Sequence, residues 1–283
     1  MRIAIASGKG GTGKTTVAVN LALIAVRAGQ TVHLGDCDVE EPNAHLLLDP
    51  ALEPPEPVTV PIPVVDAELC QHCGKCADIC EFNAIACLPE RTMVFEDLCH
   101  SCAGCWLVCP EQAITQGERT LGEIAGGTAH GMDFTHGVLR IGETVVPPLI
   151  ARVKERADDA PWTILDSPPG ATCPVVETMK DVDYVVLVTE PTPFGHHDLA
   201  LALKLARALG KPCGVVINRA LPGRDLIDHF CEQEHIEVLA HIPFRREVAA
   251  ACAEGAIAID VDQDVAAAIG ELHQALRAVE VAS

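Results

Sequence analysis

The chain has 283 residues, of which 49% are hydrophobic and 21% charged, and its 40 acidic and 20 basic residues give a formal net charge of −20. This length and apolar content allow a full hydrophobic core, in one large domain or two smaller ones. The negative charge repels phosphodiester backbones and anionic lipid surfaces, so we expect no nucleic acid and no membrane among its partners.

The sequence predicts a soluble, cytoplasmic protein. Residues 1–6 lead directly into a glycine-rich loop, without the features of a secretion signal. Polar and charged residues interrupt the longest apolar stretches, 17–28 and 199–209, before they reach the roughly 20 residues that span a bilayer. The 14 cysteines favour metal ligation over disulfides, because a reducing compartment does not preserve disulfides.

The first 48 residues predict a strand, a glycine-rich loop, a helix and a second strand, the opening of a parallel sheet. Prolines then recur from Asp49 to Pro63, which predicts a stiff, extended connector. After about residue 115 strands and helices alternate again, and two alanine-rich helices close the chain. We expect strands at 137–142, 162–167, 184–190, 213–218 and 236–242, and helices at 147–157, 195–210 and 223–232. A domain formed by residues 1–62 and 117–283 is thus predicted to be interrupted by an insert at 63–116.

The insert contains an internal repeat with an offset of 29 residues, in which Glu68–Ile85 matches Asp97–Ile114. Each copy carries Cys-x2-Cys-x2-Cys-x3-Cys, the spacing that holds [4Fe–4S] clusters, with the fourth cysteine of each run crossing to the other cluster. A pair of zinc sites is the alternative. The predicted ligands are Cys70, Cys73, Cys76 and Cys109 for the first cluster, and Cys99, Cys102, Cys105 and Cys80 for the second.

Two residues of the first copy depart from this pattern. Glu81 stands where Pro110 follows the fourth cysteine of the second copy, and we expect it to perturb the turn. Cys87 lies beyond the repeat, and we expect an ordinary buried thiol.

Residues 8–15 fit the pattern Gly-x4-Gly-Lys-Thr of a phosphate-binding loop, between a strand and a helix. Backbone N–H groups of such a loop and of the helix N-terminus bind phosphates. Lys14 is expected to contact the β- and γ-phosphates, and the Thr15 hydroxyl to ligate Mg²⁺. The predicted ATP-binding residues of the loop are Gly8, Gly10, Gly11, Thr12, Gly13, Lys14, Thr15 and Thr16.

Acidic residues follow two predicted strands, at the sheet edge where open α/β sheets bind ligands. Asp36 and Asp38 project to the same side of an extended segment, so either one could orient an attacking water or, instead, cap a helix. Asp166 ends another strand and is expected to hold Mg²⁺ through water. The predicted Mg²⁺ set is therefore Thr15, Asp36, Asp38 and Asp166.

Four motifs together resemble the deviant Walker A ATPases of the MinD/ParA/Mrp class, to which the nitrogenase iron protein also belongs. They are Lys-Gly-Gly-x-Gly-Lys-Thr-Thr at 9–16, Asp-x-Asp at 36–38, Asp-Ser-Pro-Pro-Gly at 166–170 and Val-Val-Ile-Asn-Arg at 215–219. The insert is similar to bacterial two-cluster ferredoxins, as in the ferredoxin-bearing MinD-type or cobyrinic-acid-diamide-synthase-like ATPases. The resemblance implies an α/β P-loop NTPase fold, with a mostly parallel sheet covered by helices on both faces and a small inserted α+β domain.

The resemblance also implies roles for single residues. Asp38 would be the hydrolytic aspartate, Asn218 would read adenine, and Pro243 would lie beside the base. Lys9 would reach across a two-fold interface to the partner's nucleotide, so that Lys9, Lys14 and Asp38 are the catalytic set; a solvated lysine is the alternative for Lys9. Cys173 lies seven residues beyond Asp166, as a cluster-ligating cysteine does in the nitrogenase iron protein, and is either an interface ligand or a packed thiol.

The function expected from these features is that of a Mg²⁺-dependent ATPase carrying two [4Fe–4S] clusters. ATP would control a homodimer, or a heterodimer with a related ATPase, and thereby cluster electron transfer or the assembly and transfer of clusters to an iron–sulfur or metallocluster protein. The alternative is a MinD/ParA-like spatial regulator, although residues 266–283 lack the basic amphipathic face needed for lipid binding. An amidotransferase would need a glutaminase domain, for which no residues remain.

Overall fold

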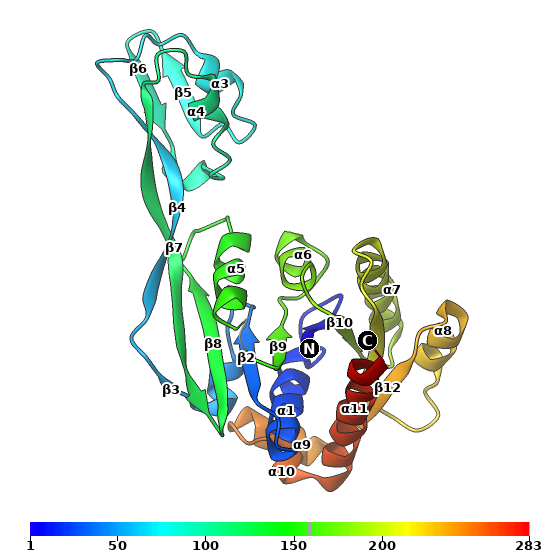
Figure 1. Cartoon of the computed structure of the whole chain (residues 1–283). Coiled ribbons are helices and arrows are strands. Elements are labelled where there is room, and N and C mark those ends of the chain that lie inside the picture. The colour runs from blue at the N-terminus through cyan, green and yellow to red at the C-terminus, as the bar shows by residue number, and fades with distance from the viewer. Residues whose placement is uncertain (158–159, 283) are drawn as a thin grey trace. The chain divides into compact units, whose positions relative to one another are not determined.

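The computed structural model describes residues 1–157 and 160–282, which form two compact units (Figure 1). The first unit comprises Met1–Pro55, Ile124–Val138 and Ile150–Ser283. The second comprises Glu56–Glu123 and Leu139–Leu149, so the predicted insert lies within it.

A sheet with a parallel centre organises the first unit. β1 lies between β9 and β10 and runs parallel to both, and every residue of β2, β9 and β10 is buried, as expected for strands covered on both faces. The short strand β3 is antiparallel to β7. In order of adjacency, the strands are β12 (Val238–Pro243), β11 (Cys213–Ala220), β10 (Tyr184–Thr189), β1 (Arg2–Ala6), β9 (Trp162–Asp166), β2 (Val32–Asp36), β8 (Met132–Leu139), β7 (Ile114–Ala129) and β3 (Ala51–Leu52).

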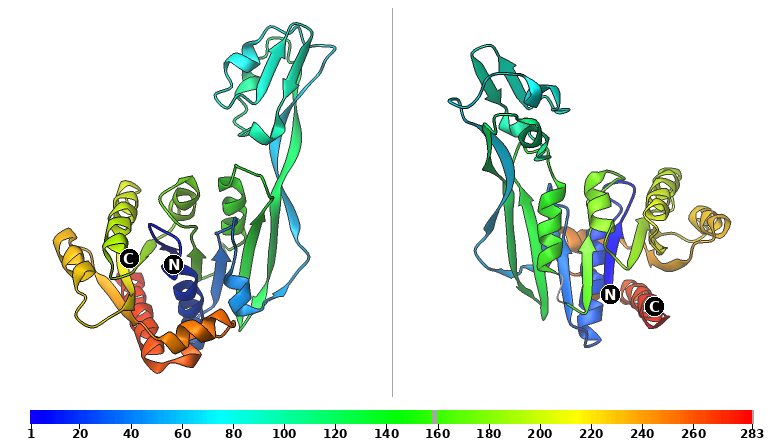
Figure 2. Two further views of the ribbon diagram at one scale, coloured as in Figure 1. Left: turned by 180° about the vertical axis from the view of Figure 1, so that it is seen from behind. Right: turned by 45° about the horizontal axis from the view of Figure 1, so that its top comes forward.

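Helices cover both faces of this sheet (Figures 1 and 2). Successive residues of a strand point to opposite faces of the sheet. On β2, Leu34 belongs to the same apolar cluster as residues of α1, whereas a Cβ added at the next residue, Gly35, would contact Val153 of α5. This arrangement confirms the predicted α/β P-loop NTPase fold. The helices are α1 (Lys14–Arg27), α2 (Ala44–Leu48), α5 (Pro147–Arg156), α6 (Cys173–Met179), α7 (Pro193–Ala208), α8 (Leu226–Glu234), α9 (Arg246–Ala253), α10 (Ala258–Val261) and α11 (Gln263–Ala282).

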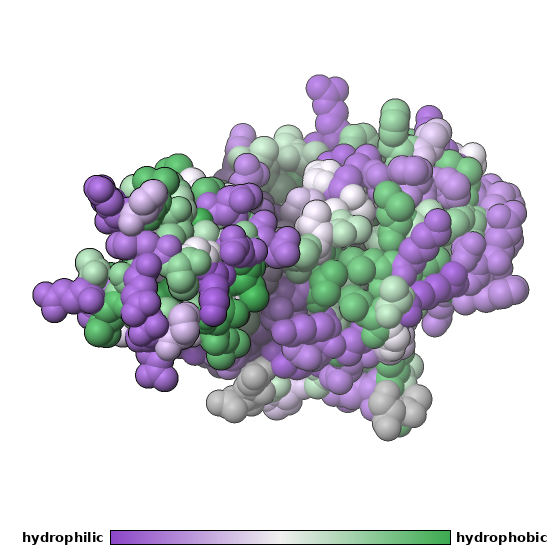
Figure 3. Space-filling view, turned by 90° about the horizontal axis from the view of Figure 1, so that it is seen from above, coloured by the Kyte–Doolittle hydropathy of each residue, from purple (hydrophilic) through white to green (hydrophobic). Residues whose placement is uncertain are grey.

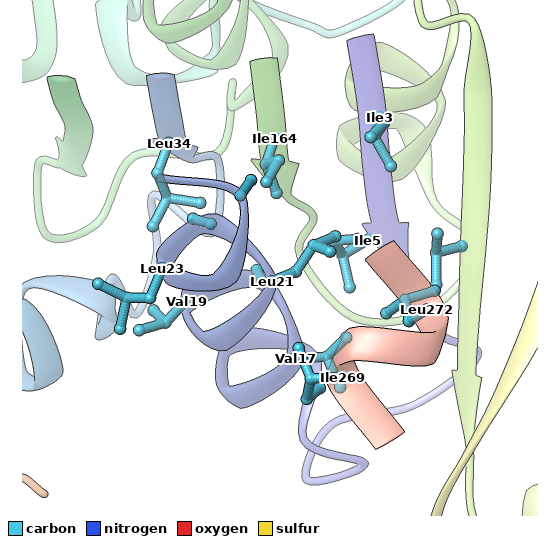
Figure 4. Packing of buried hydrophobic residues seen from close by; sticks show 14 of the residues in the cluster. Ile3, Ile5, Val17, Val19, Leu21, Leu23, Leu34, Ile164, Ile269 and Leu272 are labelled. Carbon is cyan, nitrogen blue, oxygen red and sulfur yellow. The ribbon is translucent and has the colours of Figure 1, made fainter. Parts of the chain in front are cut away.

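One part of the core of the first unit lies between α1, α11 and the sheet. Figure 4 shows side chains of α1 and α11 meeting those of the central strands. Fully burying one such side chain stabilises the fold by about 1.5–3 kcal/mol. The labelled members are Ile3, Ile5, Val17, Val19, Leu21, Leu23, Leu34, Ile164, Ile269 and Leu272.

Several expectations about elements need correction. Residues 114–139 form two strands, β7 and β8, where one strand at 137–142 is expected, and Arg140–Gly142 lie outside β8. The two strands are joined at His130 and Gly131, whose φ values of 48° and 82° suit a tight hairpin turn. The segment expected to be a plain connector, 49–63, contains β3 and most of β4 (Glu56–Val65), which pairs with β7 as an edge strand, where proline is tolerated. The short helix α6 was missed, and three helices, α9 to α11, close the chain where two were expected.

The second unit is built on the internal repeat. Beyond β4 and the first part of β7 it contains α3 (Lys75–Asp78), β5 (Ile85–Leu88), β6 (Arg91–Val94), a 3-10 turn (Glu96–Leu98) and α4 (Gly104–Val108). Positive φ angles recur in pairs 29 residues apart. The pairs are His72 and Ser101, Gly74 and Ala103, and Asn83 and Gln112.

The turn at Glu81 is unaffected by the missing proline. Asn83 N–H donates to the Cys80 carbonyl at 3.2 Å, as Gln112 N–H does to the Cys109 carbonyl at 3.3 Å. The expected perturbation at Glu81 is therefore wrong, because the backbone hydrogen bond defines the turn in both copies.

The surface mixes polar and apolar side chains. In the view from above, hydrophilic side chains cover much of the face and hydrophobic ones lie between them (Figure 3). Across 1–157 and 160–282, no helix combines the length and the apolar character required to cross a membrane.

The buried amide of Asn20 ties α1 to α10. Its Nδ2 donates to the Thr16 carbonyl at 2.7 Å, and its Oδ1 accepts the Ile259 N–H at 3.0 Å. We expect Asn20→Ala to lower the free energy of unfolding by about 1–3 kcal/mol, because it leaves a buried N–H unpaired. Arg27→Ala, which breaks the exposed ion pair with Asp260 between the same two helices, should cost less than about 1 kcal/mol. Urea denaturation followed by circular dichroism measures the free energy of unfolding of both variants. Equal losses in Asn20→Ala and Arg27→Ala would contradict this role of the amide.

Candidate functional site

A glycine-rich loop joins the carboxyl end of β1 to the start of α1. Gly11 and Gly13 have φ values of 79° and 93°, in the left-handed region that favours glycine. A Cβ at Gly13 would lie 2.3 Å from Nδ2 of Asn218, and one at Gly8 would lie 2.1 Å from the Asp198 carbonyl oxygen. The loop ends at the N-terminus of a 14-residue helix, where unpaired N–H groups and the helix dipole favour an anion.

A pocket of about 670 Å³ lies beside this loop, a volume within the range of small-molecule sites. Lys14 and Thr15 line it, and Lys14 is buried. The remaining wall comprises Gly10, Gly11, Gly13, Thr16, Asp38, Glu41, Asn43, Leu46, Leu47, Pro169, Cys252, Ala253, Glu254 and Gly255. Sequence reasoning missed the residues of α2 and of the end of α9, because no spacing indicates that these segments return to the loop.

Two of the predicted acidic residues lie side by side at the carboxyl ends of neighbouring strands. Asp36 of β2 pairs in register with Asp166 of β9. Asp36 accepts the N–H groups of Asp38, Asn43 and Ala44 at 3.0–3.1 Å, so both of its oxygens anchor the segment that follows β2. Asp38 projects from this segment into the pocket wall.

Asp166 has one oxygen engaged and one without a protein partner. Oδ2 accepts a hydrogen bond from the Thr15 hydroxyl, whereas Oδ1 is buried and has no hydrogen-bond partner among the described residues. A hydroxyl and a carboxylate next to a phosphate-binding loop are oxygen donors of the kind that Mg²⁺ prefers. The donor set around Thr15 and Asp166 therefore fits a magnesium ion.

Burial is the largest cause of the pKa shifts of the charged residues in this site. Burial, opposed by backbone hydrogen bonds, raises the pKa of Asp36 to about 6, and burial with the charge of Asp36 raises the pKa of Asp38 to about 6. The pKa of Asp166 lies well above its ordinary value for the same two reasons. Burial lowers the pKa of Lys14 even though all three carboxylates oppose that shift. One ammonium among three carboxylates leaves the site with an excess of negative charge.

Lys9 lies outside the pocket of its own chain. Its Nζ is 4.0 Å from Glu190 Oε2, and Arg219 forms a closer ion pair with the same carboxylate. The Ser7 hydroxyl donates to the Lys9 carbonyl at 2.6 Å, which fixes the backbone at this point.

The two residues expected near the base contribute differently. Asn218 Nδ2 donates to the Thr12 carbonyl at 2.7 Å, so Asn218 lies against the phosphate loop. Pro243 is the last residue of β12. Neither is part of the pocket wall described above, so their contact with a base stays a prediction.

In the second unit the eight cysteines of the repeat line two separate cavities, in the crossed grouping that their spacing predicts. The first cavity is lined by Cys70, Cys73, Cys76 and Cys109, and the second by Cys80, Cys99, Cys102 and Cys105. Backbone N–H groups donate to three of the sulfurs at 3.3–3.4 Å, namely those of Cys80, Cys99 and Cys109. No group of His, Cys, Asp or Glu within the described ranges is arranged to hold a single metal ion.

The first cavity contains a fifth thiol. Cys87, which we expected to be an ordinary buried residue, is half-buried and lines this cavity together with His72 and Thr92. The β5–β6 pairing that places it there could not be foreseen from the cysteine spacing.

The other cysteines differ in exposure. Cys173 is exposed at the first position of α6. Cys37 and Cys231 are buried, whereas Cys213 and Cys252 are only half-buried, and Cys252 lies in the wall of the pocket.

Comparisons with known proteins agree with this geometry. The model of the CobQ/CobB/MinD/ParA nucleotide binding domain matches residues 3–259. An uncharacterised protein of Methanocaldococcus jannaschii is 31% identical over 279 residues, which cover 98% of this chain and 96% of that one. An iron–sulfur cluster carrier protein of Synechocystis is 54% identical over 46 residues, 16% of this chain and 13% of that protein. The Pyrococcus furiosus cell division ATPase MinD has a similar fold, with a TM-score of 0.61, 20% identity and 98% of each chain covered.

The excess negative charge predicts that the site destabilises the fold when neither Mg²⁺ nor nucleotide is bound. A carboxylate whose pKa is raised by folding contributes stability that is present below its unfolded pKa near 3.8 and is lost as the pH rises through its folded pKa. We expect Asp166→Asn to raise the free energy of unfolding at pH 7, without Mg²⁺ or nucleotide, by about 1–3 kcal/mol, because it removes a buried, under-compensated charge.

The control is Glu271→Gln, which removes the same charge from an exposed position of α11. Urea denaturation at pH 5 and pH 8 should show a smaller loss of stability with rising pH for Asp166→Asn than for Glu271→Gln. Equal pH dependence would contradict the argument.

Proposed function

The chain belongs to the CobQ/CobB/MinD/ParA nucleotide-binding family, and from this premise we propose that it is a Mg²⁺-dependent ATPase that carries two [4Fe–4S] clusters. The nucleotide state would control electron transfer through the clusters, or their assembly and transfer to an iron–sulfur or metallocluster protein. The observation that carries the iron–sulfur part is the crossed grouping of eight cysteines around two cavities.

ATP binding is assigned to the loop between β1 and α1. Backbone N–H groups of residues 10–16 and the Lys14 ammonium would hold the phosphates. Mg²⁺, when bound, would neutralise negative charge that develops on the phosphates. Asp166 Oδ1, which has no hydrogen-bond partner within the described part of the chain, would face that ion. The Thr15 hydroxyl would also face it, either while it keeps its hydrogen bond to Asp166 or after that bond is lost.

Asp38 is assigned the role of positioning the attacking water. Its carboxylate lines the pocket, and its pKa of about 6 leaves it mostly ionised at neutral pH, able to accept a hydrogen bond from water. Asp36 accepts a hydrogen bond from the Asp38 N–H, so it would hold Asp38 in position to orient the water.

Lys9 is assigned to the nucleotide of a second copy or of a related ATPase. Within its own chain it contacts Glu190, away from the pocket wall. A lysine supplied in trans would stabilise charge on the transferring phosphoryl group, as an arginine finger does. Dimerisation would then complete the catalytic site, and the exposed Cys173 is a candidate ligand for a cluster at such an interface.

The cysteines of the second unit are suited to hold clusters. Each cavity takes three thiols from one copy of the repeat and one from the other, and N–H groups directed at the sulfurs stabilise thiolates in cluster sites. Arg119, which forms a buried ion pair with Glu143, donates to the Cys99 carbonyl at 3.0 Å and so holds the backbone at the wall of the second cavity. When bound, the clusters would supply one-electron chemistry.

A spatial regulator is less well supported. The C-terminal helix α11 buries Val265, Ile269, Leu272 and Leu276 in the core of its own unit. Its apolar side is thereby occupied, whereas reversible lipid binding needs a free apolar face with a basic border.

The iron content tests the proposal directly. Protein purified without oxygen should contain about eight iron and eight sulfide per chain. The EPR spectrum of the reduced protein should change when ATP replaces ADP, because the nucleotide state is proposed to control the clusters. Stoichiometric zinc without iron would refute the cluster assignment, and spectra identical in all nucleotide states would refute the coupling.

Complementation between two inactive variants tests Lys9. We expect Asp38→Ala to bind ATP without hydrolysing it, and Lys9→Ala to bind ATP but hydrolyse it slower by a factor on the order of 10³. A mixture of the two should regain part of the activity, because one composite site pairs an intact Lys9 with an intact Asp38.

Lys204→Ala, an exposed lysine of α7, is the control and should hydrolyse ATP normally. Normal turnover by Lys9→Ala, or mixed dimers as inactive as their parents, would exclude a trans role for Lys9.

A further inference from the structure

The first cavity of the second unit differs from the second in one chemical respect. Its wall contains five thiols, because Cys87 joins the four cysteines assigned to the first cluster. The second cavity has four thiols in its wall. The position 29 residues beyond Cys87 is Gln116, so the repeat supplies no counterpart.

The β5–β6 pair aims Cys87 at the assigned ligands. Cys87 pairs in register with Thr92, so both side chains lie on the same side of the two strands. The Thr92 hydroxyl donates to Cys87 Sγ at 3.5 Å and lies 3.4 Å from Cys70 Sγ. One hydroxyl thus bridges the fifth thiol and an assigned ligand.

His72 completes the contacts of this hydroxyl. Its Nδ1 is 3.1 Å from Thr92 Oγ1 and 3.6 Å from Cys70 Sγ. The side chains of His72, Thr92, Cys70 and Cys87 therefore form one hydrogen-bonded group beside the cavity. At the position that corresponds to His72, the second copy has Ser101.

We propose that Cys87 is a spare ligand of the first cluster, which can replace Cys70 on its iron. This inference rests on the proposed presence of [4Fe–4S] clusters. The exchange would move one proton from the Cys87 thiol to the departing Cys70 thiolate through the Thr92 hydroxyl, which would first turn from donating to Cys87 to donating to Cys70. Cys87 would then hold the iron that Cys70 had held. The number of iron–thiolate bonds and the total charge stay unchanged, so no oxidant or reductant is needed.

This exchange would make the two clusters unequal. The first cluster can release a cysteine without leaving an iron unligated, whereas the second cannot. A cluster that is passed to an acceptor thiol exchanges its cysteine ligands for those of the acceptor. The first cluster is therefore assigned as the exchangeable one, and the second as the permanent one.

Paired alanine variants at equivalent positions of the repeat test the inference. Cys70→Ala and Cys99→Ala remove the first cysteine of each copy, and alanine offers no replacement ligand. We expect Cys70→Ala to keep about eight iron per chain, because Cys87 takes over, and Cys99→Ala to keep about four. Cys70→Ala/Cys87→Ala should fall to about four, while Cys87→Ala alone should keep about eight.

Alkylation of Cys87 gives an independent readout. Iodoacetamide should modify Cys87 in the cluster-loaded wild-type protein, where it is a free thiol, and should not modify it in cluster-loaded Cys70→Ala, as mapped by mass spectrometry. The EPR signal of the second cluster, preserved in each variant at Cys70, shows that the unit remains folded.

The outcomes separate the inference from the function on which it rests. A wild-type protein without iron would overturn the proposed function, and with it this site. A wild-type protein with about eight iron, together with a Cys70→Ala variant with about four, would overturn the spare-ligand role alone. Loss of the first cluster in Cys87→Ala would also overturn it, because Cys87 would then be a permanent ligand.

Discussion

The burial of two neighbouring carboxylates, Asp36 and Asp166, is the constraint on which the first unit depends. Parallel pairing of β2 and β9 puts them in register at the sheet edge, where burial raises the pKa of each. Such an arrangement is costly unless cations and donors compensate it. Lys14 supplies one cation, the Thr15 hydroxyl supplies a donor to Asp166, and backbone N–H groups surround Asp36. The remaining excess charge favours a divalent ion, so the stability and the metal affinity of the site have the same origin.

The second unit depends on a different constraint, which is that its cysteines replace an apolar core. Cys99 packs with Ile62 and Ala84, and Cys76 and Cys105 pack with Ile85, in clusters of only a few side chains. Small domains bury too little apolar surface to be stable alone and commonly use metals as cross-links. Because each cavity takes cysteines from both copies of the repeat, neither copy can form a cavity without the other.

The sequence predicted those features that follow from local spacing or from parallel strand ends. The phosphate loop, the positions of Asp36 and Asp166 at the ends of strands, and the grouping of the eight cysteines all follow from such rules, whereas the pairing of β2 with β9 that makes the two aspartates neighbours does not. The strand β7 was missed because glycines hide its pattern. A Cβ at Gly127 would lie 2.2 Å from the Ala51 carbonyl, so glycine is needed there by the close approach of β3 and not by a loop. The place of Cys87 depends on its partner across β5 and β6, which spacing does not reveal.

The contacts of Lys9 explain how its side chain could contact a nucleotide bound to a second chain with little loss of stability in its own chain. Its ion pair with Glu190 is long, at 4.0 Å, and about a third of the Lys9 side chain is exposed, so the pair contributes at most about 1 kcal/mol. Glu190 would not be left without a counter-ion when Lys9 moves away, because Arg219 forms a closer contact with the same carboxylate. The backbone of Lys9 is meanwhile fixed by the Ser7 hydroxyl, so movement of the side chain need not deform the phosphate loop. A negatively charged phosphate presented by a second copy would therefore compete for Lys9 against a weak partner.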